Sequence, residues 1–157
     1  MKKLPPKIAR LNDIDGLIQL EEMCFKADRL TAKQLRHLIA SPTALVLVTK
    51  KTSAIIASAV VLFRKNSQIA RLYSIAVDPR FQQHGIALTL YQLIERKILH
   101  QGCTEIRLEV RNNNRRAIKF YRKNGYDFFG EYRKFYEDGT DALRMRKVIK
   151  PHATEIS

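Results

Sequence analysis

The sequence predicts an α/β fold, a single domain in which a mixed central sheet of about six to seven strands is flanked by about four helices. Its 157 residues suffice for one hydrophobic core and are few for two. The first half contains several strand patterns joined by short turns, which favours antiparallel pairing. The second half alternates strands with helices, which is typical of a sheet covered by helices. We expect this domain to fill residues 1–150 and residues 151–157 to form a C-terminal tail.

The first half is expected to supply two short helices and four strands. Residues 8–11 are predicted to form a short strand, and residues 14–25 a helix, because their apolar positions recur at helical spacing. A second helix is predicted over 31–39, where a Ser-Pro pair ends it. Further strands are predicted over residues 44–49, 54–63 and 69–77.

The second half is expected to supply two helices and three strands. After a loop over residues 80–85, apolar side chains recur at helical spacing from Gly85 to a Gln-Gly pair. Residues 104–111 alternate between apolar and charged side chains, as in a strand with one buried face. Asn114 can cap a further helix, which an Asn-Gly pair closes. Two final strands are predicted over residues 126–133 and 142–148, around an Asp-Gly turn.

The composition combines a folded chain with a large excess of positive charge. Lys and Arg number 29 and Asp and Glu number 15, so the net charge is +14. This excess favours anionic partners, but no zinc-finger pattern, aromatic RNA-binding signature or basic heptad is present, so we expect no dedicated nucleic-acid site. With only Cys24 and Cys103, we expect neither a disulfide framework nor a metal site.

The sequence also predicts where the protein acts. The longest nearly unbroken apolar stretch, residues 54–63, is too short to span a bilayer. The start of the chain, M-K-K-L-P-P-K, has no apolar segment behind its positive charges, so we expect no secretory signal. We therefore expect a cytoplasmic protein without a membrane partner.

The first candidate site is the segment from Asp78 to Leu88, where a strand ends, a loop with one glycine follows and a helix begins. A helix N-terminus has unpaired backbone N–H groups and a partial positive charge, which together suit a pyrophosphate. The alternative is an ordinary strand-to-helix connection in which Gly85 makes the turn, and the loop alone favours that alternative. It is not a Walker loop, because no Gly-Lys-Ser/Thr follows.

The second candidate site is the segment from Leu108 to Tyr121. Glu109 lies on the polar face of the predicted strand, and Tyr121 lies two helical turns after Asn114. A carboxylate near a phenol can form a base and acid pair. Taken alone, the same residues favour the alternative of a surface glutamate and a half-buried packing tyrosine.

Taken together, the two segments resemble the GCN5-related N-acetyltransferase (GNAT) superfamily. The shared motifs are Q-x-x-G-x-A at residues 82–87, N-x-x-A-I-x-x-Y at 114–121 and Gly-Tyr at 125–126. More narrowly, L-E-V-R at 108–111 and Y-R-K-F-Y-E-D-G-T-D-A-L-R-M at 132–145 are similar to the ribosomal-protein-alanine N-acetyltransferase group. The resemblance covers about residues 8–148 and implies the GNAT fold with acetyl-CoA as cosubstrate and no metal.

The resemblance implies how acetyl-CoA is held. The backbone of Ile75, Ala76 and Val77 would bind the pantetheine arm as an added strand. Asn114 would donate or accept a hydrogen bond to the same arm. The pyrophosphate would lie on the backbone N–H groups of Gln83, His84, Gly85, Ile86, Ala87 and Leu88.

The resemblance also implies the catalytic groups. Glu109 would be the general base, directly or through water, and Tyr121 the general acid that protonates the departing thiolate. A base is needed because a protein α-amine, with a pKa of about 8, is partly protonated at neutral pH. The aromatic side chains of Tyr132, Phe135 and Tyr136 would shape the groove for the first residues of the acceptor.

The acceptor is expected to be the N-terminal α-amine of a protein or peptide, with ribosomal proteins among the candidates. Relatives that modify ribosomal proteins often carry a Trp between the first two helices, and this chain has none, so the particular ribosomal acceptor stays open. One alternative is a lysine side chain or a small-molecule amine. Another is a non-catalytic acyl-CoA-binding regulatory domain, which would not need to retain Glu109 and Tyr121. The oligomeric state stays open.

Overall fold

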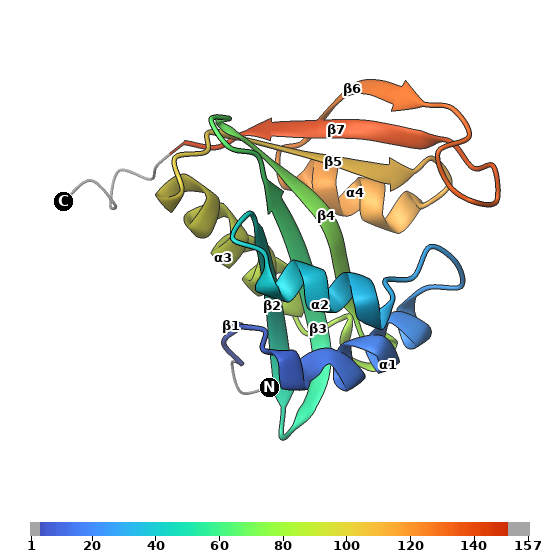
Figure 1. Cartoon of the computed structure of the whole chain (residues 1–157). Coiled ribbons are helices and arrows are strands. Elements are labelled where there is room, and N and C mark those ends of the chain that lie inside the picture. Colours follow the sequence, from blue (N-terminus) through green and yellow to red (C-terminus); the bar gives the residue numbers. More distant parts are fainter. Residues whose placement is uncertain (1–3, 151–157) are drawn as a thin grey trace.

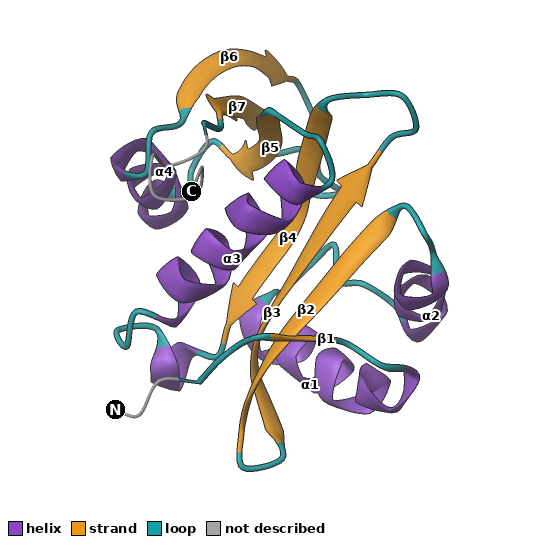
Figure 2. Ribbon diagram, turned by 90° about the vertical axis from the view of Figure 1, so that its left-hand side faces the viewer, coloured by secondary structure: helices purple, strands orange, loops and turns teal. Residues whose placement is uncertain are grey.

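A computed structural model describes residues 4–150, which form a seven-stranded mixed sheet with helices on both faces (Figures 1 and 2). The strand order across the sheet is β1-β2-β3-β4-β5-β7-β6. The strands are β1 (Lys7–Ile8), β2 (Ala44–Lys51), β3 (Ala54–Phe63), β4 (Ile69–Val77), β5 (Glu105–Arg111), β6 (Asp127–Tyr132) and β7 (Ala142–Val148). The helices are α1 (Ile14–Cys24), α2 (Ala32–Ala40), α3 (Ile86–His100) and α4 (Arg115–Lys123).

These elements confirm the predicted α/β fold class. The strands expected over residues 54–63, 69–77 and 142–148 have the bounds that the sequence predicts. The predicted C-terminal tail, residues 151–157, lies outside the described residues. Within residues 4–150, the structure contains no helix that is both long enough and apolar enough to cross a bilayer.

Two hydrophobic clusters lie on opposite faces of the sheet. Alternate residues of β2 divide between them, since Leu47 packs with the α3 and α4 side while Val46 and Val48 pack with the α1 and α2 side. Figure 2 shows α3 and α4 on one side of the sheet and α1 and α2 on the other. Both faces of the central strands are therefore buried, which explains why these strands are nearly continuous in apolar residues.

The predicted strand over residues 8–11 is wrong in its second half, because Leu11–Asp13 form a 3-10 turn. The side chain of Asp13 is responsible: its Oδ2 accepts the backbone N–H of Arg10 at 2.8 Å. Asp13 also forms an ion pair of 2.7 Å with Lys50. An aspartate that bonds nearby backbone in this way offers the chain an alternative to strand pairing.

The feature that positions the site is the separation of β4 from β5. These strands pair in parallel only from Ile69 and Glu105 to Leu72 and Leu108. A bulge opposite Val60 and Val61 leaves Tyr73 without a partner in β3. Beyond Leu72, no strand within residues 4–150 pairs with the edge of β4 that faces β5, so the middle of the sheet opens and exposes backbone groups.

Candidate active site

Two adjoining pockets lie where β4 and β5 separate. The larger, of about 430 Å³, is bordered by β4, β5 and the loops over residues 25–31 and 133–141, and we call it the loop-side groove. The smaller, of about 400 Å³, is bordered by β4, the start of α3 and α4, and we call it the helix-side groove. Both are lined by Phe25, Ile75, Asn114, Ala117 and Tyr121. The two grooves therefore meet beside these five side chains.

The helix-side groove collects most of the residues predicted to bind the cosubstrate. Those that line it are Ile75, Ala76, Val77, Gly85, Ala87, Leu88 and Asn114. Of the others, Ile86 is buried in the core, and Gln83 and His84 are exposed side chains. The prediction for these three concerns their backbone N–H groups, and it stays a prediction.

The start of α3 has the geometry of an anion site. Gly85 precedes the helix with φ 70°, a left-handed conformation that glycine adopts without strain. No side chain caps this end of the helix, and helix geometry leaves the first N–H groups without intrahelical partners. Because Gly85, Ala87 and Leu88 line the groove, these donors lie where a pyrophosphate would be favoured.

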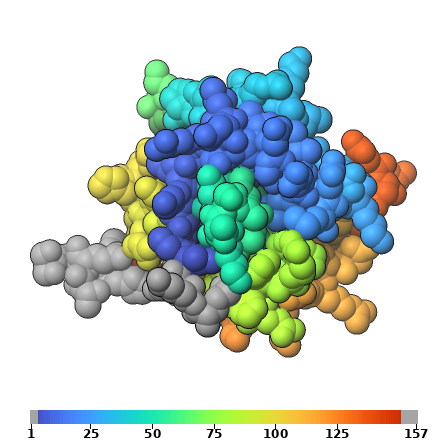
Figure 3. Space-filling view, turned by 90° about the horizontal axis from the view of Figure 1, so that it is seen from below, coloured from blue at the N-terminus to red at the C-terminus, as the bar shows by residue number. Residues whose placement is uncertain are grey.

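Gln82, the first residue of the Q-x-x-G-x-A motif, joins three elements at the rim of this groove. Its side-chain Nε2 donates to the carbonyl of Val77 at 3.3 Å, and its Oε1 accepts from Arg116 of α4. Figure 3 shows the yellow-green part of the chain, to which residues 79–85 belong, beside the orange part, to which α4 belongs. The Val77 carbonyl also accepts the Cys24 thiol at 3.3 Å, so a pantetheine contact at Val77 would have to compete with two existing bonds.

Asn114 and Tyr121 approach the junction of the grooves from α4. The Oδ1 of Asn114 accepts the N–H of Ala117 at 3.1 Å, which confirms that Asn114 caps the helix. The ring of Tyr121 is buried and packs against Tyr126 and Phe120, with centroids 5.3 and 5.5 Å away. Burial, with a smaller contribution from Tyr136, raises the pKa of Tyr121, so its phenol stays protonated at neutral pH.

Glu109 lies in the loop-side groove, which Tyr121 also lines. Its side chain is only 8% exposed and forms an ion pair with Arg71 of β4. Arg71 belongs to β4 and Glu109 to β5, so their ion pair bridges the two strands at the point where they begin to separate. The structure thus brings both predicted catalytic side chains to one groove, and their roles stay predictions.

Glu21 of α1 is a second carboxylate of this groove, and the sequence predicts it only as part of the helix over residues 14–25. The residue is 6% exposed, and its Oε2 has no hydrogen-bond partner within residues 4–150. Burial raises its pKa to about 7, against the opposing effects of the Leu30 N–H and the Arg29 charge. The sequence does contain a signal for a buried carboxylate here, because Glu21 follows Leu17 by one helical turn and so lies on the apolar face of the helix.

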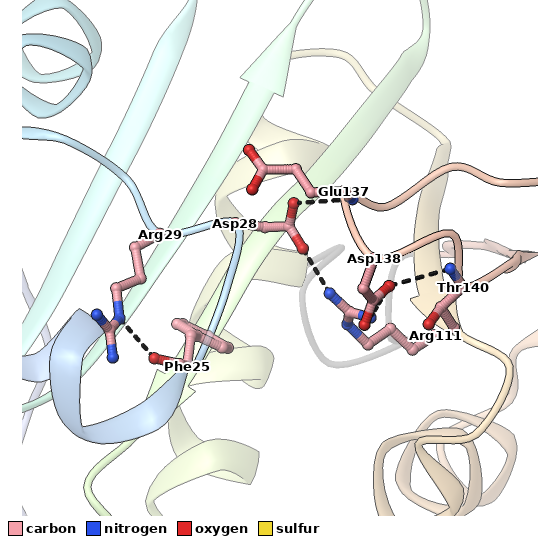
Figure 4. A network of polar contacts seen from close by, with 7 residues as sticks. All are labelled: Phe25, Asp28, Arg29, Arg111, Glu137, Asp138 and Thr140. Carbon is pink, nitrogen blue, oxygen red and sulfur yellow. Dashed lines mark hydrogen bonds and ion pairs between the residues drawn. The ribbon is translucent and has the colours of Figure 1, made fainter.

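The two loops that border the loop-side groove are tied together by Arg111, at the end of β5 (Figure 4). Its guanidinium forms an ion pair with Asp28 in one loop and donates to both carboxylate oxygens of Asp138 in the other, at 2.8 and 2.9 Å. It also lies 4.2 Å from the ring centre of Tyr136. Bonds from Thr140 and Arg111 lower the pKa of Asp138 to about 2, so the tie is ionised at neutral pH.

Two of the three aromatic residues predicted to shape an acceptor groove line the loop-side groove, and their role toward an acceptor stays a prediction. Phe135 and Tyr136 line the loop-side groove, and Tyr132 stacks on Phe135 with ring centroids 5.4 Å apart. Within the described part of the chain, no group of three or more His, Cys, Asp or Glu side chains could hold a metal ion.

The sequence of residues 14–126 matches that of the Acetyltransferase (GNAT) family. The chain belongs to this family. This finding confirms the predicted enzyme class, an acetyl-CoA-dependent N-acetyltransferase, at the level of the family. In a GNAT protein, a groove with free strand backbone and a helix N-terminus is suited to pantetheine and pyrophosphate, as the residues lining the helix-side groove would allow.

Individual relatives of this GNAT chain are distant. The Bacillus subtilis protein YdhI is 31% identical over 83 residues, which are 53% of this chain and 48% of YdhI, so the chain aligns with about half of that protein. Acetyltransferase ECA0875 from Pectobacterium atrosepticum is 30% identical over 124 residues, 77% of this chain and 86% of that protein.

A solved structure confirms the GNAT fold over nearly the whole chain. The crystal structure of the ribosomal-protein-S18-alanine N-acetyltransferase from Escherichia coli superposes with a TM-score of 0.83 and covers 96% of this chain and 97% of that one. At 23% sequence identity, the likeness shows the fold alone.

Proposed function

We propose that this GNAT protein transfers the acetyl group of acetyl-CoA directly to the N-terminal α-amine of a protein or peptide while both substrates are bound. The observation that carries the proposal is the junction of the two grooves at Tyr121, with Glu109 in the loop-side groove. Two substrates that enter by different grooves would meet there, so no acetylated enzyme intermediate is required.

The helix-side groove is the proposed site of acetyl-CoA. The pantetheine arm would pair with the unpaired edge of β4 at Ile75 and Ala76, as an added strand does. The pyrophosphate would be bound by the N-terminus of α3, and Arg116 in the groove wall adds a positive charge. Asn114 accepts a helix N–H through Oδ1, and within residues 4–150 its Nδ2 donates no hydrogen bond, which supports its use toward the pantetheine.

The loop-side groove is the proposed site of the acceptor. An ammonium group is attracted there by Glu109 and Glu21, and Phe25, Phe135 and Tyr136 offer apolar surface to the first side chain. Buried carboxylates favour a bound cation because the surrounding protein screens charge less than water does.

The reaction then needs two proton transfers. As the amine nitrogen bonds to the acetyl carbon, its proton passes to the Glu109 carboxylate, directly or through water. As the carbon–sulfur bond breaks, the Tyr121 phenol gives its proton to the thiolate. The raised pKa of Tyr121 keeps the phenol protonated before the reaction. Burial also makes the departing thiolate more basic, which is what allows it to take a proton from so weak an acid. The products are the amide and the free thiol, and Tyr121 regains a proton from Glu109 through solvent.

The test is the release of free thiol from acetyl-CoA with short peptides that carry a free N-terminus, compared with N-blocked peptides that contain lysine. We expect release only with free N-termini. Thiol release only with lysine peptides or small amines would support the acetyl-transfer reaction and contradict the α-amine as its acceptor. Acetyl-CoA binding without release for any amine would favour the non-catalytic domain.

The role of Glu109 has its own matched control on the same strand. Glu109→Gln should lose at least about a hundredfold in kcat while the Kd for acetyl-CoA changes less than about threefold. Glu105→Gln removes a carboxylate from the same face of β5, outside the groove, and should leave kcat unchanged. Equal kcat for Glu109→Gln and the unmodified protein would show that Glu109 is not the base. A ribosomal protein as acceptor and action in the cytoplasm stay predictions.

A further inference from the structure

The face of β5, β7 and β6 opposite α4 carries an arginine–aromatic surface, of which the proposed reaction uses Phe135 alone. We define this surface by Arg107, Phe129, Tyr132, Phe135, Arg144 and Arg146. Helices α1 and α2 pack against β2, β3 and β4, so they leave this part of the sheet uncovered (Figure 1).

The surface is built around two rings. The guanidinium carbons of Arg107, Arg144 and Arg146 lie 5.0, 4.4 and 5.3 Å from the ring centre of Phe129. Arg144 is also 4.4 Å from the ring centre of Tyr132, which in turn stacks on Phe135 at 5.4 Å. Contacts of this kind hold arginine side chains in place against the sheet, so their charges are preorganised.

The surface continues directly from the loop-side groove. Phe135 belongs to both, since it lines the groove and stacks on Tyr132. Arg144 of β7 is the cross-strand neighbour of Glu109 of β5, and such neighbours project from the same face of a sheet. A peptide whose N-terminus lies beside Glu109 therefore has this surface next to its following residues.

The charges of the surface are not balanced. Arg107 forms an ion pair with Glu105, and the neighbouring Arg71 with Glu109. Arg144 and Arg146 form no ion pair with any carboxylate in residues 4–150, although Asp127 is the cross-strand neighbour of Arg146. The Nε of Arg144 is also buried without a hydrogen-bond acceptor among those residues. A charged donor without an acceptor is unusual in native proteins, and it leaves the positive charge of Arg144 without a counter-ion.

We propose that this surface binds an acidic segment of the acceptor that follows its first residues, with Arg144 as the main contact. The inference rests on the proposed function, because it concerns the part of the acceptor peptide that extends out of the loop-side groove and states which charge is preferred there. A carboxylate can accept from the guanidinium N–H groups of Arg144, which is partly exposed, and of Arg146, which is exposed. An acceptor with lysines or arginines at these positions would be repelled.

A peptide fits the surface better than RNA does. Binding of RNA depends on several neutralised phosphates, whereas Arg144 and Arg146 are the two unpaired arginines here. Bases would also need free ring faces, and the Phe129 ring is already surrounded by three guanidinium groups.

The test compares peptides that share their first two residues and differ afterwards in a pair of Asp, Asn or Lys residues. We expect kcat/KM for the Asp peptide to exceed that for the Asn peptide by about fivefold to tenfold at low salt, and the Lys peptide to be the poorest. The preference should shrink as salt rises. Arg144→Gln should reduce the Asp-to-Asn ratio to less than about twofold.

Two further variants separate binding from folding. Arg146→Gln, at an exposed position, should lower the same ratio partially, and Arg96→Gln on α3, on the other face of the sheet, should leave it unchanged. Equal kcat/KM for the Asp and Asn peptides on the unmodified protein would overturn the inference alone. So would tight, salt-sensitive binding of an RNA oligonucleotide that Arg144→Gln abolishes. No acetylation of any free N-terminus would overturn the proposed function and this inference with it.

Discussion

Substitution of Glu21 by Gln should make the protein more stable, by an amount that grows as the pH rises from about 4.5 to 7. The folded protein raises the pKa of Glu21 from its ordinary value of 4.5 to about 7, because burial penalises the charged carboxylate. Below pH 4.5, the side chain is protonated in both the folded and the unfolded chain, so it costs nothing. As the pH rises toward 7, the unfolded chain ionises first, and the folded state loses stability relative to it.

The size of the effect follows from that pKa difference. At about 1.4 kcal/mol per pKa unit, a rise from 4.5 to about 7 corresponds to about 3 kcal/mol of lost stability above pH 7. Gln has nearly the same shape, can still accept the N–H of Leu30 and carries no charge to bury. Glu21→Gln should therefore raise the unfolding free energy by up to about 3 kcal/mol at pH 8, or about 6–12 °C in Tm, and by almost nothing at pH 4.5.

The assay is thermal and denaturant unfolding of both proteins at several pH values from 4.5 to 8. All other titrating groups are shared, so they cancel in the difference between the variant and the unmodified protein. The control is Glu22→Gln, an exposed neighbour on the same helix, which should change stability by less than about 0.5 kcal/mol at every pH. A Tm difference for Glu21→Gln that does not vary with pH, or a loss of stability at pH 8, would refute the reasoning.

Three further predictions concern the grooves. Tyr121→Phe should lower kcat by more than about tenfold in thiol-release assays while the protein still folds, and an unchanged kcat would remove the phenol from the mechanism. Arg111→Ala unties Asp28 from Asp138 and should raise the KM for peptide acceptors severalfold, whereas equal increases for peptide and acetyl-CoA would point to a general loss of structure. Gly85→Ala places a side chain at φ 70°, where no described atom lies within 4 Å, so the change is backbone strain without a clash. It should lower the unfolding free energy by about 1–2 kcal/mol, measured by denaturant unfolding. It should also weaken acetyl-CoA binding, measured by calorimetry. Full stability of Gly85→Ala would contradict that account.

The strands and helices were predictable because local pattern and burial agree in them. β3 is a run of apolar residues bounded by turns and β5 alternates strictly, and the structure buries the residues that these patterns select. The short strand β1 was overestimated because Asp13 bonds back to Arg10, a competition that hydrophobic pattern does not register.

The site was predictable only in part, for a physical reason. Sequence motifs identified Glu109 and Tyr121, which belong to neighbouring elements in the second half of the chain and line one groove. The separation of β4 and β5 after Leu72 is a property of the whole sheet, and it alone makes Glu21 and Arg71 part of that groove. The tie formed by Arg111 likewise joins residues that lie 83 and 27 positions away in the chain.

Whether the acceptor is an α-amine can be decided with a single peptide. The peptide carries a free N-terminus, an acidic pair after its second residue and one internal lysine. After incubation with acetyl-CoA and the enzyme, fragmentation mass spectrometry locates the acetyl group. The account predicts acetylation of the N-terminal nitrogen and an unmodified lysine. Acetylation of the lysine beside a free N-terminus would contradict it.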